Sequence, residues 1–341
     1  MIKDIIIPKE GETKFIFFSG KGGVGKSTMS CSTAVWLANK GYKTLIVTTD
    51  PAPNLSDIFG QDIGHKITLV RGIKNLFAIE IDPDVASEEY RERVIAPIRE
   101  ILDEKNLQII REQLNSPCVE EVAAFDKFIE FMDDPQYDVV IFDTAPTGHT
   151  IRLLELPSGW STELEKGGST CIGPSASLQN AKSKYEKAIS YLQNDDKTSF
   201  IFVLKPENSS ILETKRSSEE LAKLGIKTTF LIINGLLPKE VCTDEFFKNK
   251  REEEQKVIDK ISDEFKAVPK IFYPLRDSEI SGLELLNSVG QFLYEGKKHG
   301  VEAKLSDVKS VGKIQLMGNL KEIQNLFTPL NGTRYIFFTV N

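Results

Sequence analysis

The chain has 341 residues, of which 40% are apolar, and a formal net charge of -7, so it can bury a core and is neither a disordered chain nor a general nucleic-acid binder. No apolar run approaches the roughly 20 residues of a membrane span, and the charged N-terminus MIKDIIIPKEGETKF lacks the apolar centre of a signal peptide. We therefore expect a cytoplasmic protein that binds no nucleic acid and does not itself insert into a membrane.

Short apolar segments alternate with helical patterns along most of the chain. Several of the apolar segments lack polar alternation, as expected of strands that helices cover on both faces. The predicted strands are Lys14–Ser19, Thr44–Thr48, Asn75–Ile81, Asp138–Phe142, Phe200–Leu204, Thr228–Ile233 and Pro269–Tyr273. The predicted helices are Lys26–Lys40, Ser209–Leu224, Lys239–Phe265 and Glu279–Tyr294. This order predicts an α/β fold with a doubly wound, mostly parallel sheet of the P-loop NTPase type.

Two insertions interrupt the alternation. The first, about residues 83–135, is expected to be wholly helical, and the second, Pro157–Pro174, is irregular and rich in glycine. Both follow predicted strands, and folds of this kind place their ligands at the carboxyl ends of strands. The insertions are therefore the expected places for additional binding residues.

The C-terminal residues break the pattern. We expect a P-loop ATPase domain over residues 1–297 and a polar linker, rich in Lys and Gly, over 298–332. The last residues, TRYIFFTVN at 333–341, resemble TKFIFFSGK at 13–21. The preferred interpretation is the first strand of a truncated second ATPase repeat, and the alternative is chance similarity between two strands.

The strongest local signal is the segment GKGGVGKS, Gly20–Ser27, which follows a predicted strand and opens a predicted helix. Its glycines allow successive backbone N–H groups and the helix N-terminus to face phosphates. Lys26 is expected to contact the β- and γ-phosphates of ATP, and the Ser27 hydroxyl to coordinate Mg²⁺. The expected nucleotide-binding residues of this segment are Gly20, Lys21, Gly22, Gly23, Val24, Gly25, Lys26, Ser27 and Thr28.

Acidic residues follow two of the apolar segments. Asp143 ends DVVIFD at the Walker B position and is expected to hold Mg²⁺, and Asp50 ends TLIVTTD and is a second candidate for the metal. Hydrolysis also needs a group that positions or deprotonates water. Asp50 and Asp57 are both candidates for that role, and the alternative for each is a capping or turn aspartate.

Several strings together resemble one family. GKGGVGKST, TTDPAPNLSD, FDTAPTGHTIRLLELP and LIINGLLP are similar to the arsenical-pump ATPases and to their relatives, the tail-anchored-protein targeting ATPases, over about residues 14–295. The additional lysine near the start of the loop, Lys21, marks the deviant Walker A segment of MinD-like dimerising ATPases. The resemblance implies that Lys21 reaches the nucleotide of an opposing half, and that adenine lies against Asn234 and Pro274.

The resemblance also implies a metalloid site. Cys118 and Cys171 lie in segments, about 115–121 and 167–175, that look like the metalloid-site segments of the arsenical-pump ATPases. Arsenite and antimonite are soft centres that prefer thiolates, although free cysteines also serve as small buried residues. The family completes its site with a cysteine from the other half and with weaker ligands that map to His149 and Ser116. The remaining thiols, Cys31 and Cys242, are expected to be structural.

Three functions remain open. The first is an ATPase stimulated by arsenite or antimonite that energises extrusion through an integral-membrane partner, working with a second half or a homodimer partner. Such a protein would lie peripherally at the inner face of the membrane. The second is an ATP-dependent targeting factor for tail-anchored membrane proteins, against which the 4 methionines and the absence of a CxxC pair count weakly. The third is a nucleotide-switched dimer with a partitioning or regulatory role.

Overall fold

The computed structural model describes residues 2–48, 55–115, 117–133, 136–143 and 186–297. All of them belong to one unit, Met1–His299. Asp50, Ser116, His149, Cys171, the predicted linker 298–332 and the segment 333–341 lie outside these residues. The domain organisation expected for the C-terminal part of the chain therefore stays a prediction.

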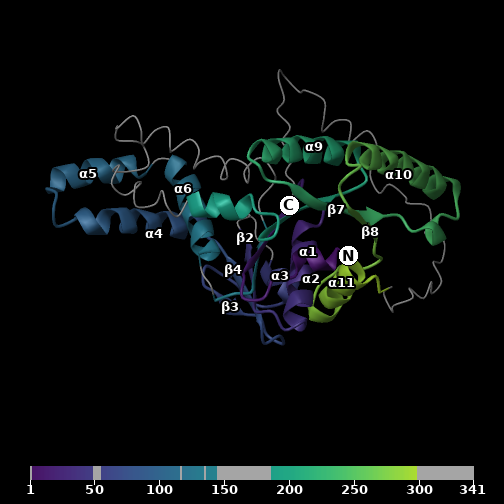
Figure 1. Cartoon of the computed structure of the whole chain (residues 1–341), viewed down its shortest axis with the longest axis horizontal. Coiled ribbons are helices and arrows are strands. Elements are labelled where there is room, and N and C mark those ends of the chain that lie inside the picture. The colour runs from purple at the N-terminus through teal and green to yellow at the C-terminus, as the bar shows by residue number, and fades with distance from the viewer. Residues whose placement is uncertain (1, 49–54, 116, 134–135, 144–185, 298–341) are drawn as a thin grey trace, which may run out of the picture. The chain divides into compact units, whose positions relative to one another are not determined.

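The described residues form an eight-stranded sheet (Figure 1). Its strands are β1 (Lys14–Ser19), β2 (Thr44–Thr48), β3 (Thr68–Leu69), β4 (Leu76–Glu80), β5 (Val139–Asp143), β6 (Thr198–Leu204), β7 (Thr228–Leu236) and β8 (Lys270–Pro274). They lie in the order β3-β4-β2-β5-β1-β6-β7-β8, and all neighbouring pairs are parallel except β3 with β4. The predicted fold class is confirmed. Seven of the strands were predicted, whereas the two-residue β3 is too short to give a pattern in the sequence.

Strand β1 lies in the middle of the sheet, between β5 and β6, and every one of its residues is buried. On one face, the ring of Phe17 stacks on Phe142 and Phe200, with centroids 4.7 and 5.3 Å apart. On the other face, Ile16 and Phe18 belong to the cluster that includes the helix after the glycine loop. Burial of one such side chain contributes roughly 2–3 kcal/mol, so the strand that leads into the glycine loop is firmly held.

Helices lie over the sheet, and the first helices of the insertion, over residues 83–113, extend away from it (Figure 1). They are α1 (Lys3–Ile6), α2 (Lys26–Asn39), α3 (Leu55–Phe59), α4 (Pro83–Ile95), η1 (Ala96–Ile98), α5 (Glu104–Gln113), α6 (Pro117–Met132), α9 (Asn208–Lys223), η2 (Lys239–Val241), α10 (Glu245–Glu264) and α11 (Leu283–Glu295). Helix α2 is buried on nearly all sides. Helix α11 packs closely on α2. If Gly290 of α11 carried a Cβ, that atom would lie 2.5 Å from the Cβ of Trp36 on α2.

The helical insertion expected between the third and fourth predicted strands is present as α4, η1, α5 and α6. Asp82 caps α4 by accepting hydrogen bonds from two backbone N–H groups, and Pro83 occupies the first helical position, where no N–H is needed. Asp103 caps α5 by accepting a hydrogen bond from the backbone N–H of Asn106. The Arg91 side chain then joins the two helices by donating to the carbonyl of Leu114, 3.1 Å away.

Two predicted helix boundaries differ from the structure. The helix expected over Lys239–Phe265 is divided into the short η2 and the long α10, because Asp244 caps a new helix through the N–H of Phe247. The helix expected from Glu279 begins only at Leu283, after Gly282 with a φ of 80°. In both cases a local residue that starts a helix overrides the apolar periodicity.

Candidate nucleotide site

The glycine-rich segment connects β1 to α2, as the sequence predicts. Lys26 and Ser27 are the first two residues of α2, and the Lys26 side chain is buried. Backbone N–H groups at such a helix start have no partner within the helix, and the helix dipole favours negative charge there. The loop and the helix start together form a surface suited to phosphate.

Two glycines are required by the contacts of this loop. Gly20 has a φ of 151°, and a Cβ there would lie 2.2 Å from the carbonyl oxygen of Val203 on β6. Gly25 has a φ of 92° in the left-handed region, and a Cβ there would lie 2.5 Å from Nδ2 of Asn234. Any larger residue would push the loop away from the strands beside it, so the loop fits closely against β6 and β7.

Asn234 lies on β7 and contacts the loop directly. Its Nδ2 donates a hydrogen bond of 2.8 Å to the carbonyl of Val24. The pairing of β7 with β8 shifts register between Asn234 and Leu236, at Gly235. Pro274, the last residue of β8, lies opposite Leu236. The residues expected to contact adenine therefore lie on adjacent strands at the same sheet edge as the loop. Their contact with adenine itself stays a prediction.

Asp143 ends β5 next to the strand that carries the loop. It is aligned with Phe18 of β1 and Thr48 of β2, and its side chain is buried. Burial, together with the charges of Asp143 and Glu80, raises the pKa of the Cys31 thiol on α2. The carboxylate of Asp143 is thus placed near the face of α2, at the end of the strand where a Walker B residue is expected. The neutral, buried Cys31 agrees with a structural role.

Asp57 lies in the first turn of α3, and its side chain is exposed. The preceding residue, Ser56, is held by Glu80 at the end of β4, whose Oε1 accepts from the Ser56 backbone N–H at 3.1 Å. Glu80 was not among the predicted site residues. Its only signal in the sequence is a carboxylate at a strand end, and its partner comes from a different part of the chain. Glu80 thereby fixes the start of the helix that carries Asp57.

The additional lysine near the start of the loop, Lys21, is exposed and contacts a different element. Its Nζ lies 3.1 Å from Oγ of Ser209 in the first turn of α9. In the part of the chain that the structure describes, Lys21 therefore lies at the surface between the loop and α9. Its role toward an opposing half stays a prediction.

The predicted metalloid ligands are mostly beyond the described ranges. Cys118 lies in the first turn of α6, and Ser116, His149 and Cys171 fall outside the described residues. Among the residues that are described, no group of three or more His, Cys, Asp or Glu side chains is arranged to hold a metal ion. Cys242 follows η2, where its Sγ lies 3.3 Å from the carbonyl of Pro238.

These features define a P-loop nucleotide-binding protein. The loop follows a buried parallel strand, needs glycine at two positions and leads into a helix that starts with lysine, and a buried aspartate lies on the adjacent strand. Comparison with known families narrows this class, because residues 13–295 match the family model described as anion-transporting ATPase. The chain belongs to that family.

Individual relatives agree with this assignment. The chain is 54% identical over 341 residues to a Halobacterium salinarum protein with the provisional name arsenical pump-driving ATPase, a match over 99% of the chain and 53% of that protein. It is 38% identical over 280 residues to the Escherichia coli arsenical pump-driving ATPase, a match over 80% of the chain and 48% of that protein. An ATPase ASNA1 homologue of Paramecium tetraurelia is 32% identical over 314 residues, 83% of the chain and 94% of that protein.

The chain thus spans about half the length of the arsenical pump-driving relatives it matches. The predicted family is confirmed, and the description of the family and the names of these relatives are those of ATPases. No helix among the described residues is long and apolar enough to cross a membrane.

Proposed function

We propose that the chain binds MgATP in the glycine loop and hydrolyses it, and that arsenite or antimonite bound by cysteine thiolates stimulates this hydrolysis. The observation that carries the nucleotide part is the loop itself, which can lie close to β6 and β7 because Gly20 and Gly25 have no Cβ. The names of the relatives and the segments around the two cysteines support the metalloid part.

Each residue of the nucleotide site has a distinct role. The loop N–H groups and Lys26 bind the phosphates, while Ser27, Asp143 and Asp50 are the candidate holders of Mg²⁺. Mg²⁺ held there would supply positive charge that offsets the negative charge developing on the phosphates. Asn234 keeps the loop in place through Val24, and it contacts adenine together with Pro274.

Hydrolysis requires a positioned water molecule next to the γ-phosphate. Asp50 and Asp57 are the two candidates for holding that water, and the exposed position of Asp57 on α3 is compatible with movement toward a bound nucleotide. Lys21 contributes when two halves, or two copies, face each other across the nucleotide. Pairing is supported by the exposed position of Lys21 at the loop surface.

The metalloid is bound by the thiolates of Cys118 and Cys171, with a further ligand from the opposing half and with Ser116 and His149 as weaker ligands. Binding to two halves at once favours the closed pair, in which hydrolysis is fastest. The energy of the cycle then drives metalloid extrusion through an integral-membrane partner, which would hold the ATPase at the inner face of the membrane. The alternative is a targeting factor for tail-anchored membrane proteins. The match to 94% of the Paramecium tetraurelia ATPase ASNA1 homologue keeps this alternative open.

The test is the ATPase rate of the purified chain with and without antimonite, repeated for Cys118→Ser and Cys171→Ser. We expect stimulation in the parent and its loss in both variants, with the unstimulated rate retained. Cys242→Ser is the matched control, because this half-buried thiol follows η2 and is not part of the proposed site. Stimulation that survives both substitutions would contradict the metalloid site, and co-purification of a tail-anchored protein would favour the alternative.

A further inference from the structure

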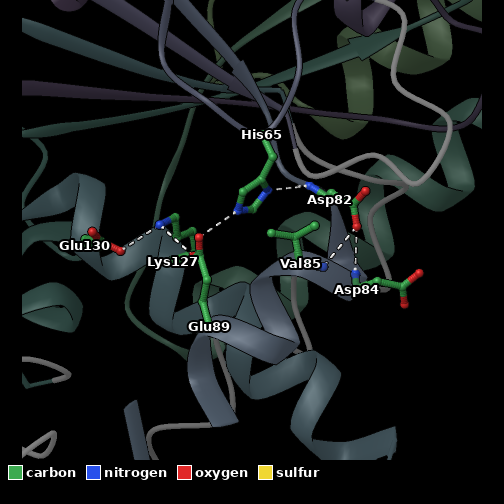
Figure 2. A network of polar contacts seen from close by, with 7 residues as sticks. All are labelled: His65, Asp82, Asp84, Val85, Glu89, Lys127 and Glu130. Atoms are coloured by element: carbon green, nitrogen blue, oxygen red, sulfur yellow. Dashed lines mark hydrogen bonds and ion pairs between the residues drawn. The ribbon is translucent and has the colours of Figure 1, made fainter. Parts of the chain in front are cut away.

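A histidine joins the edge of the sheet to the helical insertion. His65 lies in the connection between α3 and β3, and its side chain is 14% exposed. Its Nδ1 accepts a hydrogen bond of 2.9 Å from the backbone N–H of Asp82, the residue that caps α4. Its Nε2 lies 3.5 Å from Oε1 of Glu89 on α4 (Figure 2).

The histidine contact continues into α6, the last helix of the insertion. Lys127 of α6 donates from Nζ to Oε2 of Glu89 at 3.1 Å, and it also forms an ion pair with Glu130 at 3.2 Å (Figure 2). A second ion pair, between Arg93 and Asp126, joins the same two helices. Helices α4 and α6 are therefore tied to each other, and His65 ties α4 to the loop beside the sheet.

The loop that carries His65 is bound on its other side to α3. Ile63 N donates to Ser56 Oγ at 3.1 Å, and Ser56 Oγ donates to the Ile63 carbonyl at 3.1 Å. The carbonyl of Gly64 accepts from the N–H of Glu80 at 3.0 Å. A displacement of α3 would thus be transmitted to Ile63 and, two residues later, to His65.

The hydrogen bond to Nδ1 determines how the ring can act. An acceptor nitrogen carries no hydrogen, so the neutral ring has its proton on Nε2, the atom that faces Glu89. The distance of 3.5 Å to Glu89 is longer than an ordinary hydrogen bond. The Asp82 contact is therefore the fixed side of the ring, and the Glu89 contact is the side that can shorten or lengthen when the loop moves.

We propose that His65 is a positioning residue that couples α3, which carries the candidate catalytic residue Asp57, to the α4–α6 pair, whose helix α6 carries Cys118. This inference rests on the proposed function, because it supposes that nucleotide displaces α3. Coupling of this kind requires an element whose arrangement both sites bias. The short loop Ile63–His65, bound to α3 on one side and to the insertion on the other, is that element.

The test uses amide hydrogen exchange in residues 83–95 and 117–132, with and without Mg²⁺ and a non-hydrolysable ATP analogue. In the parent, the analogue should change exchange in both helices by about threefold or more. His65→Leu removes both ring contacts and should abolish the change. His65→Asn keeps an acceptor near the Asp82 N–H, and His65→Gln keeps a donor toward Glu89. Each of these variants should retain only part of the nucleotide-dependent change in exchange.

Glu92→Gln is the matched control. Glu92 lies on α4, three residues after Glu89, but pairs with Arg99 inside the insertion. This variant should respond to nucleotide as the parent does. A second readout is the affinity for antimonite, measured with and without the analogue. The ratio of the two affinities should be at least about threefold smaller in His65→Leu than in the parent, while the affinity for the analogue alone is retained.

The outcomes separate this inference from the function on which it rests. A parent that binds no nucleotide overturns both. A parent that binds nucleotide without any change in α4 and α6, or a His65→Leu variant that transmits the full change, overturns the coupling role alone. If His65→Leu does not fold, the Asn and Gln variants decide, because full transmission in both would contradict the role of the ring.

Discussion

Asn234 holds the glycine loop by a hydrogen bond of 2.8 Å from its Nδ2 to the carbonyl oxygen of Val24, across 210 residues of sequence. The same side chain fills the space in which a Cβ on Gly25 would lie. The end of β7 therefore shapes the loop from outside, whether or not Asn234 also contacts adenine. This arrangement explains why the loop needs glycine at position 25.

Asn234→Ala should weaken nucleotide binding by about threefold to tenfold, since it removes one hydrogen bond worth roughly 0.5–1.5 kcal/mol. The measurement is the dissociation constant of ADP with Mg²⁺. Asn75→Ala is a suitable control, because Asn75 Nδ2 also donates to a backbone carbonyl, that of Gly41 at 3.1 Å. Asn75 precedes β4, at the opposite end of the strands from the loop. Equal losses in the two variants would argue against a specific role for Asn234.

Gly25→Ala should reduce both stability and nucleotide binding. The alanine would have to adopt a φ of 92° and place its Cβ 2.5 Å from Asn234 Nδ2, at a cost of about 1–3 kcal/mol. Gly41→Ala separates the two effects, because Gly41 has a φ of 99° and no heavy atom lies within 4 Å of the position that its Cβ would take. We expect both variants to lose stability in urea, but only Gly25→Ala to lose affinity for ADP by about tenfold or more. Wild-type affinity in Gly25→Ala would show that the loop can move away from Asn234 without consequence.

The sequence predicted the sheet well because its strands are continuous apolar runs bounded by polar residues. The seven predicted strands and the helical insertion are all present. Contacts between distant segments could not be predicted in this way. Glu80 meets Ser56, and His65 meets Glu89, only because β4 lies near the edge of the sheet beside β2.

The break between η2 and α10 was missed for a different reason. The apolar residues on both sides of Asp244 continue a helical period, whereas the side chain of Asp244 accepts from the N–H of Phe247 and starts a new helix. A capping aspartate inside a periodic segment is therefore more informative than the period itself.

Lys14→Met should stabilise the protein at neutral pH. Lys14 is 3% exposed, and burial lowers its pKa to about 8 although the charges of Asp196 and Asp195 oppose the shift. Its ammonium donates to the carbonyls of Asp196 at 2.9 Å and Asp195 at 3.3 Å, which offsets part of the desolvation. We expect a net gain of about 1 kcal/mol on replacement at pH 7.

The pH dependence gives this prediction its sign. A lysine with a lowered pKa in the folded state destabilises the fold fully below about pH 8, and this cost disappears as pH rises toward the unfolded value of 10.5. The advantage of Lys14→Met over the parent in urea unfolding should therefore shrink between pH 8 and pH 10.5. Lys215→Met is the control, because Lys215 pairs with Glu264 at the surface and shares no partner with Lys14. A variant less stable than the parent at pH 7 would mean that the carbonyl contacts outweigh desolvation.

Glu295→Gln should have the opposite pH dependence. The Glu295 carboxylate accepts Lys297 Nζ at 2.7 Å, Lys40 Nζ at 2.6 Å and Trp36 Nε1 at 2.9 Å, and these partners lower its pKa to about 2. The interaction joins the end of α11 to the end of α2, the helix that begins in the glycine loop. Loss of the charge should cost about 1 kcal/mol at pH 7, after allowance for solvent screening.

A carboxylate with a lowered pKa stabilises the fold above its unfolded value of 4.5, and this stabilisation is lost as pH falls toward 2. The parent and Glu295→Gln should therefore differ in urea at pH 7 and converge as the pH is lowered from 4.5 toward 2. Glu253→Gln, which breaks an exposed pair with Lys256 on α10, should leave stability unchanged at neutral pH. A constant difference between the parent and Glu295→Gln from pH 7 to pH 2 would assign the effect to packing of the side chain, because only the charge is lost over that range.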